Sequence, residues 1–310
     1  MDSLREAVYE YIAMRRGLGY KLAHAGLLQD FACFMEQQNA STITADWAVK
    51  WAQKPVSAQP VTWSNRLTVL RGFAQFRAAT DPRTEIPAPN LLPHKPKRAT
   101  PFLFAGSEIQ RLLQGALALP GATPLKRRTY YCLFGLLFVS GMRISEVIGL
   151  KICNADLNNG VLTVKGAKTG KIRLIPLHES TRKVLLNYKL HRSRALKGKA
   201  SEYFFVSDAG NKLCVETVRD TFYLLLVRIG LPPREKGKGP RLHDMRHQFV
   251  IETLLRSYRN KENVELVLPA LATFLGHTNI NDTYWYLSAC PELMGVAVQR
   301  LEEHWKEAKL

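Results

Sequence analysis

The chain is poor in cysteine and in long apolar runs, and each shortage excludes classes of protein. Its five cysteines are odd in number and never form a C-x-x-C pair, which argues against a disulfide framework and a cysteine zinc site. The N-terminal M-D-S-L-R-E-A lacks the apolar region of a signal peptide. The longest apolar stretch, around residues 130–140, is too short to cross a bilayer and predicts a buried helix. We therefore expect a soluble, cytoplasmic protein that does not contact a membrane.

Acidic residues are also scarce relative to basic ones. The sequence has 26 acidic residues against 44 lysines and arginines, so its net charge is +18. A basic surface binds nucleic acid because neutralising phosphates releases counterions. The alternative is a basic protein whose lysines are only solvated. With 310 residues, 46% of them hydrophobic, the chain can form one large or two modest domains.

Hydrophobic periodicity predicts two folded parts joined by a linker. Residues 1–80 show helical spacing throughout, with helices expected to begin near Thr44 and Val61. Prolines and a basic run interrupt residues 81–101, which predicts an extended, semi-rigid linker. Residues 102–310 form the second domain, with a C-terminal tail at 291–310.

The second domain mixes helices with a few short strands. We expect helices from Ser107, with that residue as N-cap, over about 130–138, and from near residues 215, 243 and 268. Residues 161–164 and 172–175 predict a hairpin, and 203–206 another short strand. The fold class is therefore mainly α with a small antiparallel sheet in the second domain.

Six residues, spread over nearly half of the chain, together provide the side chains that phosphodiester chemistry needs. Cleavage without a metal requires cations around the phosphate, an acid for the leaving oxygen and a nucleophile. The six are Arg143, Lys168, His243, Arg246, His277 and Tyr286. Glu146 lies three residues after Arg143, where a helix would let its carboxylate orient the guanidinium. An ordinary surface ion pair is the alternative for that pair.

Competing residues stand close to two of these positions. Lys165 and Lys171 share the predicted hairpin turn with Lys168, and each is also a candidate phosphate contact. Tyr284 lies two residues before Tyr286 and is a rival nucleophile.

Further basic residues are candidates for contacting DNA. They are Arg66, Arg71 and Arg77 on the helix predicted from Val61, and Lys97 and Arg98 in the predicted linker. The three helix arginines could equally form the solvated face of an amphipathic helix.

A zinc site is an alternative use of the histidines. His243 and His247 are four residues apart, as in H-E-x-x-H metalloproteases, and His277 could be a third ligand. However, Asp244 stands where the metalloprotease motif has Glu, and Arg246 would place a cation beside the metal. We therefore expect no metal.

The local sequences resemble the tyrosine recombinase (phage integrase) family, which includes the Xer, Cre and integron recombinases. G-M-R-I-S-E-V-I-G-L is similar to the family's first arginine box, and H-D-M-R-H to its H-x-x-R-H motif. L-G-H-T, with a tyrosine nine residues after the histidine, is similar to the second box. Lys168 is assigned by its place five residues before the arginine of R-L-I-P-L. The resemblance covers nearly the whole chain.

The resemblance implies an architecture and a partner. Residues 1–80 would be a helical, SAM-like core-binding domain, and residues 102–310 the catalytic domain of a two-domain, C-shaped clamp. The partner would be double-stranded DNA with inverted-repeat core sites, bound as two duplexes by a homotetramer. The tail at 291–310 would dock on a neighbouring subunit, with packing on its own domain as the alternative. The sequence does not identify accessory proteins.

The resemblance also implies a mechanism. Tyr286 would attack a DNA phosphate, giving a 3′-phosphotyrosyl link and a free 5′ hydroxyl. Arg143 and Arg246 would hold the non-bridging oxygens, and His277 would donate to a phosphate oxygen. His243 would assist proton removal from the tyrosine, and the hairpin lysine would protonate the leaving oxygen. Neither a cofactor nor a metal is expected, because the covalent link conserves the bond energy and the arginines stabilise the charge.

Two other functions remain open on the sequence. A type IB topoisomerase shares this chemistry but rejoins the same strand, and a DNA-binding relative would not cleave at all. The complete set of six residues argues against the protein that does not cleave, and strand exchange for integration, excision or transposition is the leading interpretation. The segments T-P-F-L-F and D-T-Y-W-Y-L-S-A are also similar to recombinases of transposons and other mobile elements.

Overall fold

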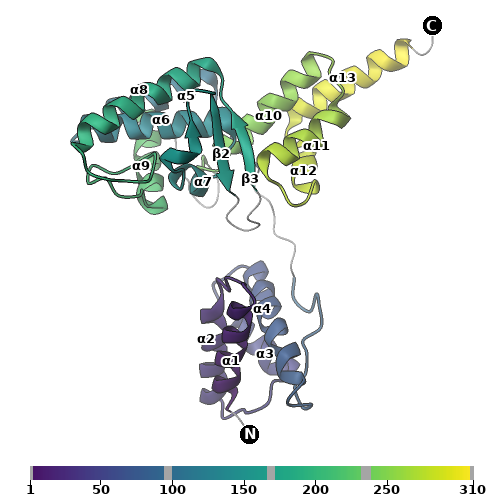
Figure 1. The fold of residues 1–310 in the computed structure, drawn as a ribbon. Coiled ribbons are helices and arrows are strands. Elements are labelled where there is room, and N and C mark those ends of the chain that lie inside the picture. Colours follow the sequence, from purple (N-terminus) through teal and green to yellow (C-terminus); the bar gives the residue numbers. More distant parts are fainter. Residues whose placement is uncertain (1–2, 94–99, 166–171, 232–238, 308–310) are drawn as a thin grey trace. The chain divides into compact units, whose positions relative to one another are not determined.

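The computed structural model describes residues 3–93, 100–165, 172–231 and 239–307. The chain divides into two compact units, Met1–Arg98 and Ala99–Leu310, each with an apolar core of its own (Figure 1). Helices dominate both units, and the second holds a small antiparallel sheet, so the predicted fold class is confirmed. In the described ranges no helix is both long and apolar enough to cross a membrane.

The described part of the first unit is built from four helices. They are α1 (Leu4–Gly17), α2 (Ala25–Gln37), α3 (Ala45–Gln53) and α4 (Pro60–Ala78). Local signals explain where they begin. Ser3 and Glu6 form a capping box at α1, and the Thr44 hydroxyl accepts the backbone N–H of Trp47 at 3.2 Å. Pro60 occupies the first turn of α4, where its missing N–H costs nothing.

The segment after α4 packs on the first unit. The Arg71 guanidinium donates to the carbonyl of Pro87 at 2.7 Å, and the backbone N–H of Glu85 donates to the carbonyl of Ile43 at 2.8 Å. Leu92 is buried in the same core. The beginning of the region predicted as an extended linker, 81–101, is therefore held against the helices by hydrogen bonds and apolar contact.

The second unit combines a short sheet with helices. Its described elements are α5 (Gly106–Leu117), α6 (Pro124–Ser140), α7 (Ile144–Ile148), the 3-10 helix η1 (Ile152–Asn154), β1 (Ala155–Asp156), β2 (Val161–Lys165), β3 (Ile172–Pro176), α8 (Glu179–Leu196), α9 (Val215–Arg228), α10 (Asp244–Arg259), α11 (Val264–Leu275), α12 (Asn281–Ala289) and α13 (Pro291–Glu307). The strands pair antiparallel in the order β1-β2-β3, with Val161 opposite Pro176. This confirms the predicted hairpin, whose turn at 166–171 lies outside the described residues. Strand β1 was not predicted.

Two details of the second unit differ from the sequence prediction. Residues 203–206 make isolated bridges instead of a strand; their two central phenylalanines are both buried, so successive side chains do not alternate between faces as in a regular strand. Helix α5 begins one residue before Ser107, since the Glu108 carboxylate accepts the backbone N–H of Ala105 at 2.8 Å and caps that end.

Helices α10 to α13 enclose a second apolar core in this unit (Figure 1). Helix α11 begins at Val264, earlier than the predicted start near residue 268, because the Asn263 side chain caps it. The predicted tail contributes buried Leu293 to this core, and Arg300 donates to the carbonyl of Glu262 at 2.8 Å. The tail thus packs on its own domain in the single chain, and its docking on a neighbouring subunit stays a prediction.

Gly141, which ends α6, allows a quantitative test of this packing. Its φ is +57°, and an added Cβ would lie 2.5 Å from Cδ1 of Phe249 and 3.1 Å from Cδ2 of Leu275. We expect Gly141→Ala to lower the free energy of unfolding by about 3 kcal/mol, through backbone strain and overpacking together. Gly121→Ala is the matched control, because Gly121 has a φ of +62° and open space around it. Urea titration should show a loss of roughly 1 kcal/mol there; equal losses would show that the Phe249 contact does not matter.

Candidate active site

The described members of the six-residue set lie together in the second unit. They are Arg143 at the start of α7, His243 and Arg246 at the start of α10, His277 just after α11, and Tyr286 in α12. Each is close enough to affect another electrostatically. The charges of Arg246, Arg143 and His243 act on the pKa of His277, and Tyr286 acts on that of Arg246. Four predicted residues lie outside the described ranges: Lys168, Lys171, Lys97 and Arg98.

Arg246 is buried between the ends of two helices. Its side chain donates from Nη1 to the carbonyl of Gly141 at 2.7 Å and from Nη2 to the carbonyl of Leu275 at 2.8 Å, with 2% of the residue exposed. These carbonyls belong to the C-terminal ends of α6 and α11, where a cation is favourable. Burial, and secondly the charge of Arg143, lower the pKa of Arg246 to about 10, so it remains a cation at neutral pH.

Arg143 is held beside Arg246 by a buried carboxylate. Nη2 of Arg143 donates to the carbonyl of Gly276 at 3.3 Å, adjacent to the carbonyl bound by Arg246. Glu146 accepts from Nη1 of Arg143 at 3.1 Å and from two nitrogens of Arg173 at 3.0 and 2.7 Å. Burial alone would raise the pKa of Glu146, but these hydrogen bonds lower it below its ordinary value. Glu146 therefore orients both arginines, whereas the sequence linked it only to Arg143.

The two predicted histidines are neutral at physiological pH. Desolvation of the rings by the surrounding protein, and secondly the charge of Arg246, lower the pKa of His243 and of His277 to about 4. Nδ1 of His277 lies 2.7 Å from Oγ1 of the buried Thr283, which fixes the orientation of the ring. A neutral imidazole held in this way can still donate one N–H to an anion.

Tyr286 lies inside the fold, whereas the rival Tyr284 is 43% exposed. Tyr286 is 2% exposed, and its Oη lies 2.7 Å from Nδ1 of His247. The His247 ring in turn meets the His243 ring edge-on, with 4.6 Å between ring centroids. One continuous region at the start of α10 therefore contains the Tyr286 phenol, the His243 and His247 rings and Arg246.

Three residues of this region were not assigned to it from the sequence. Arg173 occupies the inward position of β3 between exposed Ile172 and Leu174, an inverted alternation that could have marked it. His247 was considered only as a metal ligand. Thr283 carries no signal of its own, because its contact with the His277 ring depends on how the loop after α11 folds back.

The candidate DNA-binding arginines of α4 have partners within the first unit. Arg66 pairs with Asp30 at 2.8 Å and lies over the Trp51 ring, and Arg71 holds the segment after α4. Arg77 is buried. Because of these contacts, the three arginines are neither a solvated helix face nor a row of side chains that all point to solvent. DNA contact by these residues stays a prediction. Lys165 ends β2 and is exposed.

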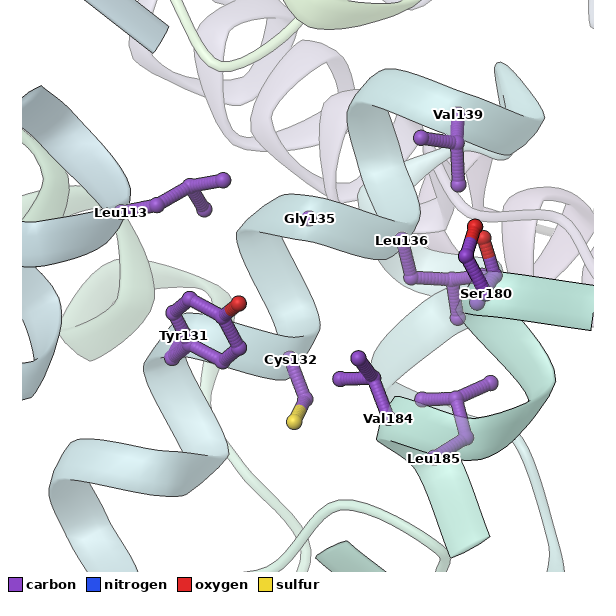
Figure 2. Close-up of a pocket in the computed structure, with 10 residues that line it drawn as sticks. Leu113, Tyr131, Cys132, Gly135, Leu136, Val139, Ser180, Val184 and Leu185 are labelled. Carbon is purple, nitrogen blue, oxygen red and sulfur yellow. The ribbon is translucent and has the colours of Figure 1, made fainter. Parts of the chain in front are cut away.

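Two other possible sites can be compared with this cluster. Within the described ranges, no group of three His, Cys, Asp or Glu residues is placed to hold a metal ion. An apolar pocket between α5, α6 and α8 contains none of the six predicted residues (Figure 2). The cluster around Arg246 is thus the candidate active site.

The site should make stability depend on pH. His243 and His277 have pKa values near 4 in the folded chain and near 6.5 when unperturbed. The unfolded chain therefore binds more protons between these limits, and the free energy of unfolding falls as the pH drops through this window. In urea titrations at pH 7 and pH 5, the double variant His243→Asn/His277→Asn should lose less stability on acidification than the unchanged chain. An equal loss would contradict the assignment.

Glu146 should contribute far more to the free energy of unfolding than an exposed glutamate does. Glu146→Gln leaves Arg173 buried without its charged partner, and we expect a loss of about 3 kcal/mol in the free energy of unfolding. Glu179→Gln is the matched control, since its pairing with Arg182 is exposed and should contribute less than about 1 kcal/mol. Similar small losses for both variants would show that Glu146 does not organise the site.

Comparison with known proteins places this cluster in a family. The sequence profile of the Phage integrase family matches residues 104–292. A protein of Sinorhizobium fredii named "Putative integrase/recombinase y4rB" is 49% identical, and the match covers 99% of each chain. The tyrosine recombinase XerD of Lacticaseibacillus casei is 29% identical over 92% of this chain and 94% of its own length.

Solved structures share the fold at low sequence identity. The Tn1549 transposon integrase, solved with a circular intermediate DNA, superposes with a TM-score of 0.65 at 16% identity, covering 97% of this chain and 100% of that chain. The XerH recombinase bound to difH gives a TM-score of 0.62 at 20% identity over 91% of this chain and 77% of its own. The profile match over more than half of the sequence and the nearly full-length relative show that the chain belongs to the phage integrase family of tyrosine recombinases.

Proposed function

We propose that this chain is a site-specific recombinase that cuts and rejoins double-stranded DNA through a covalent bond between Tyr286 and a 3′ phosphate. The observation that carries the proposal is the meeting of two guanidiniums at adjacent carbonyls: Arg246 binds that of Leu275, and Arg143 that of Gly276. Two fixed cations close to a phenol suit a phosphate attacked at phosphorus. Such preorganised charge acts without reorganisation at the moment of reaction.

Each group of the site has its own role in the proposed reaction. Arg143 and Arg246 hold the non-bridging oxygens and offset the charge of the transition state, at roughly 3 kcal/mol per donor. His277, whose ring is oriented by its contact at Nδ1, donates to a phosphate oxygen. The phenol oxygen of Tyr286 forms a bond to phosphorus as the bond to the 5′ oxygen breaks. Lys168, in the predicted hairpin turn, protonates that leaving oxygen, and His243 is the sequence-based candidate to assist removal of the phenol proton.

The reverse step completes strand exchange. The 5′ hydroxyl of a partner strand attacks the phosphotyrosine and displaces the phenol, so the number of phosphodiester bonds is conserved. No nucleotide cofactor is consumed. The arginines provide the charge stabilisation for which other phosphoryl-transfer enzymes use metal ions.

The proposal includes an assembly on DNA. The net charge of +18 suits a polyanionic partner, and exposed Lys165 stands next to the predicted hairpin turn. A lambda integrase, a structural neighbour, has been solved as a tetramer bound to a Holliday junction. Exposed apolar residues of α13, which lie close to one helical stripe, suit a contact with a neighbouring subunit; they are Met294, Val298, Leu301 and Trp305. We infer a homotetramer on two duplexes with inverted-repeat core sites.

The biological reaction would be integration, excision or transposition of a mobile element, carried out in the cytoplasm. The fold likeness to a transposon integrase and the relatives named as integrases support this proposal. The same comparisons favour strand exchange over a type IB topoisomerase, because the relatives named are recombinases and integrases. A catalytically silent DNA-binding protein would have no need of the Arg143, Arg246 and Tyr286 arrangement.

The test is to trap covalent complexes in cells and sequence the attached DNA. The full chain should yield one recurring sequence joined at a 3′ phosphate. Tyr286→Phe should reduce the covalent adduct at least ~100-fold, because it removes the nucleophilic oxygen, while DNA binding stays near normal. Tyr284→Phe is the matched control two residues away and should leave the adduct unchanged.

Each alternative has its own outcome in this experiment. Adduct formation that persists in Tyr286→Phe but is lost in Tyr284→Phe would move the nucleophile to the exposed tyrosine. No adduct on any DNA from the unchanged chain would overturn the recombinase proposal. Loss of adduct on adding a chelator would restore the metal interpretation.

A further inference from the structure

The hydrogen bond between His247 and Tyr286 is not explained by the roles described so far. The sequence assigns removal of the phenol proton to His243, yet the structure places Nδ1 of His247 2.7 Å from the phenol oxygen. A general base must lie within hydrogen-bond reach of the proton it removes, and this distance meets that requirement before any DNA is present.

The surroundings of His247 hold its ring in this orientation. His247 is 8% exposed, and its ring packs against Trp285 and Tyr286 with ring centroids 5.6 and 5.3 Å apart. The His243 ring covers another side at 4.6 Å and an interplanar angle of 87°. A ring enclosed by three others has little rotational freedom, so Nδ1 stays directed at the phenol.

His243 occupies a different place in the same cluster. It forms the N-cap of α10 and is exposed, whereas His247 lies in the first turn and faces the core shared by α10 and α12. Of the two rings, that of His247 has its Nδ1 2.7 Å from the phenol oxygen. His243 is thus accessible to a bound phosphate, and His247 contacts the phenol.

We propose that His247 is the group that accepts the proton of Tyr286 during DNA cleavage. This inference rests on the proposed function of the site. The phenol O–H bond breaks as an N–H bond forms at Nδ1, and the oxygen uses its electron pair to bond to phosphorus. The bond to the 5′ oxygen breaks, and that oxygen takes a separate proton from the acid. When a 5′ hydroxyl reverses the step, the imidazolium returns its proton to the phenol oxygen.

This role requires one tautomer of the neutral ring. Nδ1 must carry the lone pair that accepts the phenol proton, and Nε2 must carry the hydrogen. In that tautomer the phenol O–H donates to Nδ1 across the observed 2.7 Å, and this is the arrangement from which the transfer starts.

The test compares three variants on the duplex recovered by trapping in cells. His247→Phe keeps a ring of similar shape and removes the acceptor, and His247→Asn places an amide oxygen where Nδ1 stands but cannot take a proton. His243→Phe serves as the comparison within the cluster, and His191→Phe, on α8 outside the site, as the control for surface effects. The rate of covalent adduct formation is measured for each full-length variant, with DNA binding measured in parallel.

A second substrate separates the base from the acid. In a duplex with sulfur in place of the leaving 5′ oxygen, departure no longer needs a proton, so loss of a general acid is rescued while loss of the base is not. We expect His247→Phe to slow adduct formation ~100-fold or more on both duplexes, with site binding retained. His247→Asn should also be slow on both, because its amide positions the phenol without accepting the proton.

Each other result overturns the inference. Rescue by sulfur would make His247 an acid, and a faster rate in His247→Phe would make the hydrogen bond a restraint on the nucleophile. A normal rate in His247→Asn would reduce the role to positioning, and this variant decides the question if His247→Phe folds poorly. A normal rate in His247→Phe, with loss on both duplexes in His243→Phe, would return proton removal to His243. All four outcomes require adduct formation by the unchanged chain, so they are distinct from failure of the recombinase proposal.

Discussion

The guanidinium of Arg246, buried between the carbonyl ends of two helices, joins the segments on which the candidate site depends. It satisfies backbone acceptors at the ends of α6 and α11, which the helices themselves leave unpaired. Both ends are closed by glycines in the left-handed conformation, Gly141 and Gly276, which turns the chain away so that a cation can approach. One side chain of α10 thereby fixes two other helices, and the segments that follow them carry Arg143 and His277.

This arrangement gathers positive charge in a small volume. Arg143, Arg173 and Arg246 lie close together, and the buried carboxylate among them is that of Glu146. The fold reduces the repulsion by keeping His243 and His277 neutral. A phosphate diester would bring the missing negative charge to this place. The rest of the fold therefore offsets the repulsion between these cations, and under the proposed function a bound phosphate would relieve it.

The sequence predicts the chemistry of this site better than its contacts. Local motifs predict four members of the site, because each motif combines a required side chain with the turn that presents it. These members are Arg143, Arg246, His277 and Tyr286. The hairpin and the helices of the first unit follow from periodicity and caps such as Thr44. Contacts between distant segments could not be predicted in this way.

Arg173 and His247 illustrate the reason. Arg173 reaches Glu146 from another element, and His247 reaches Tyr286 across the packing of α10 on α12. Periodicity shows which face of an element is buried but not what it meets there. The contacts of the α4 arginines could not be predicted for the same reason, since Asp30 and the carbonyl of Pro87, which bind two of them, come from other parts of the first unit.

The placement of Tyr286 couples the nucleophile to the terminal helix. The Tyr286 side chain is shielded from solvent in the isolated chain, with 2% of the residue exposed. A single residue, Cys290, separates α12 from α13. A displacement of α13 would therefore also displace α12, the helix that carries the phenol. Under the proposed function, contacts made by α13 with a neighbouring subunit would therefore act on the helix that carries the nucleophile.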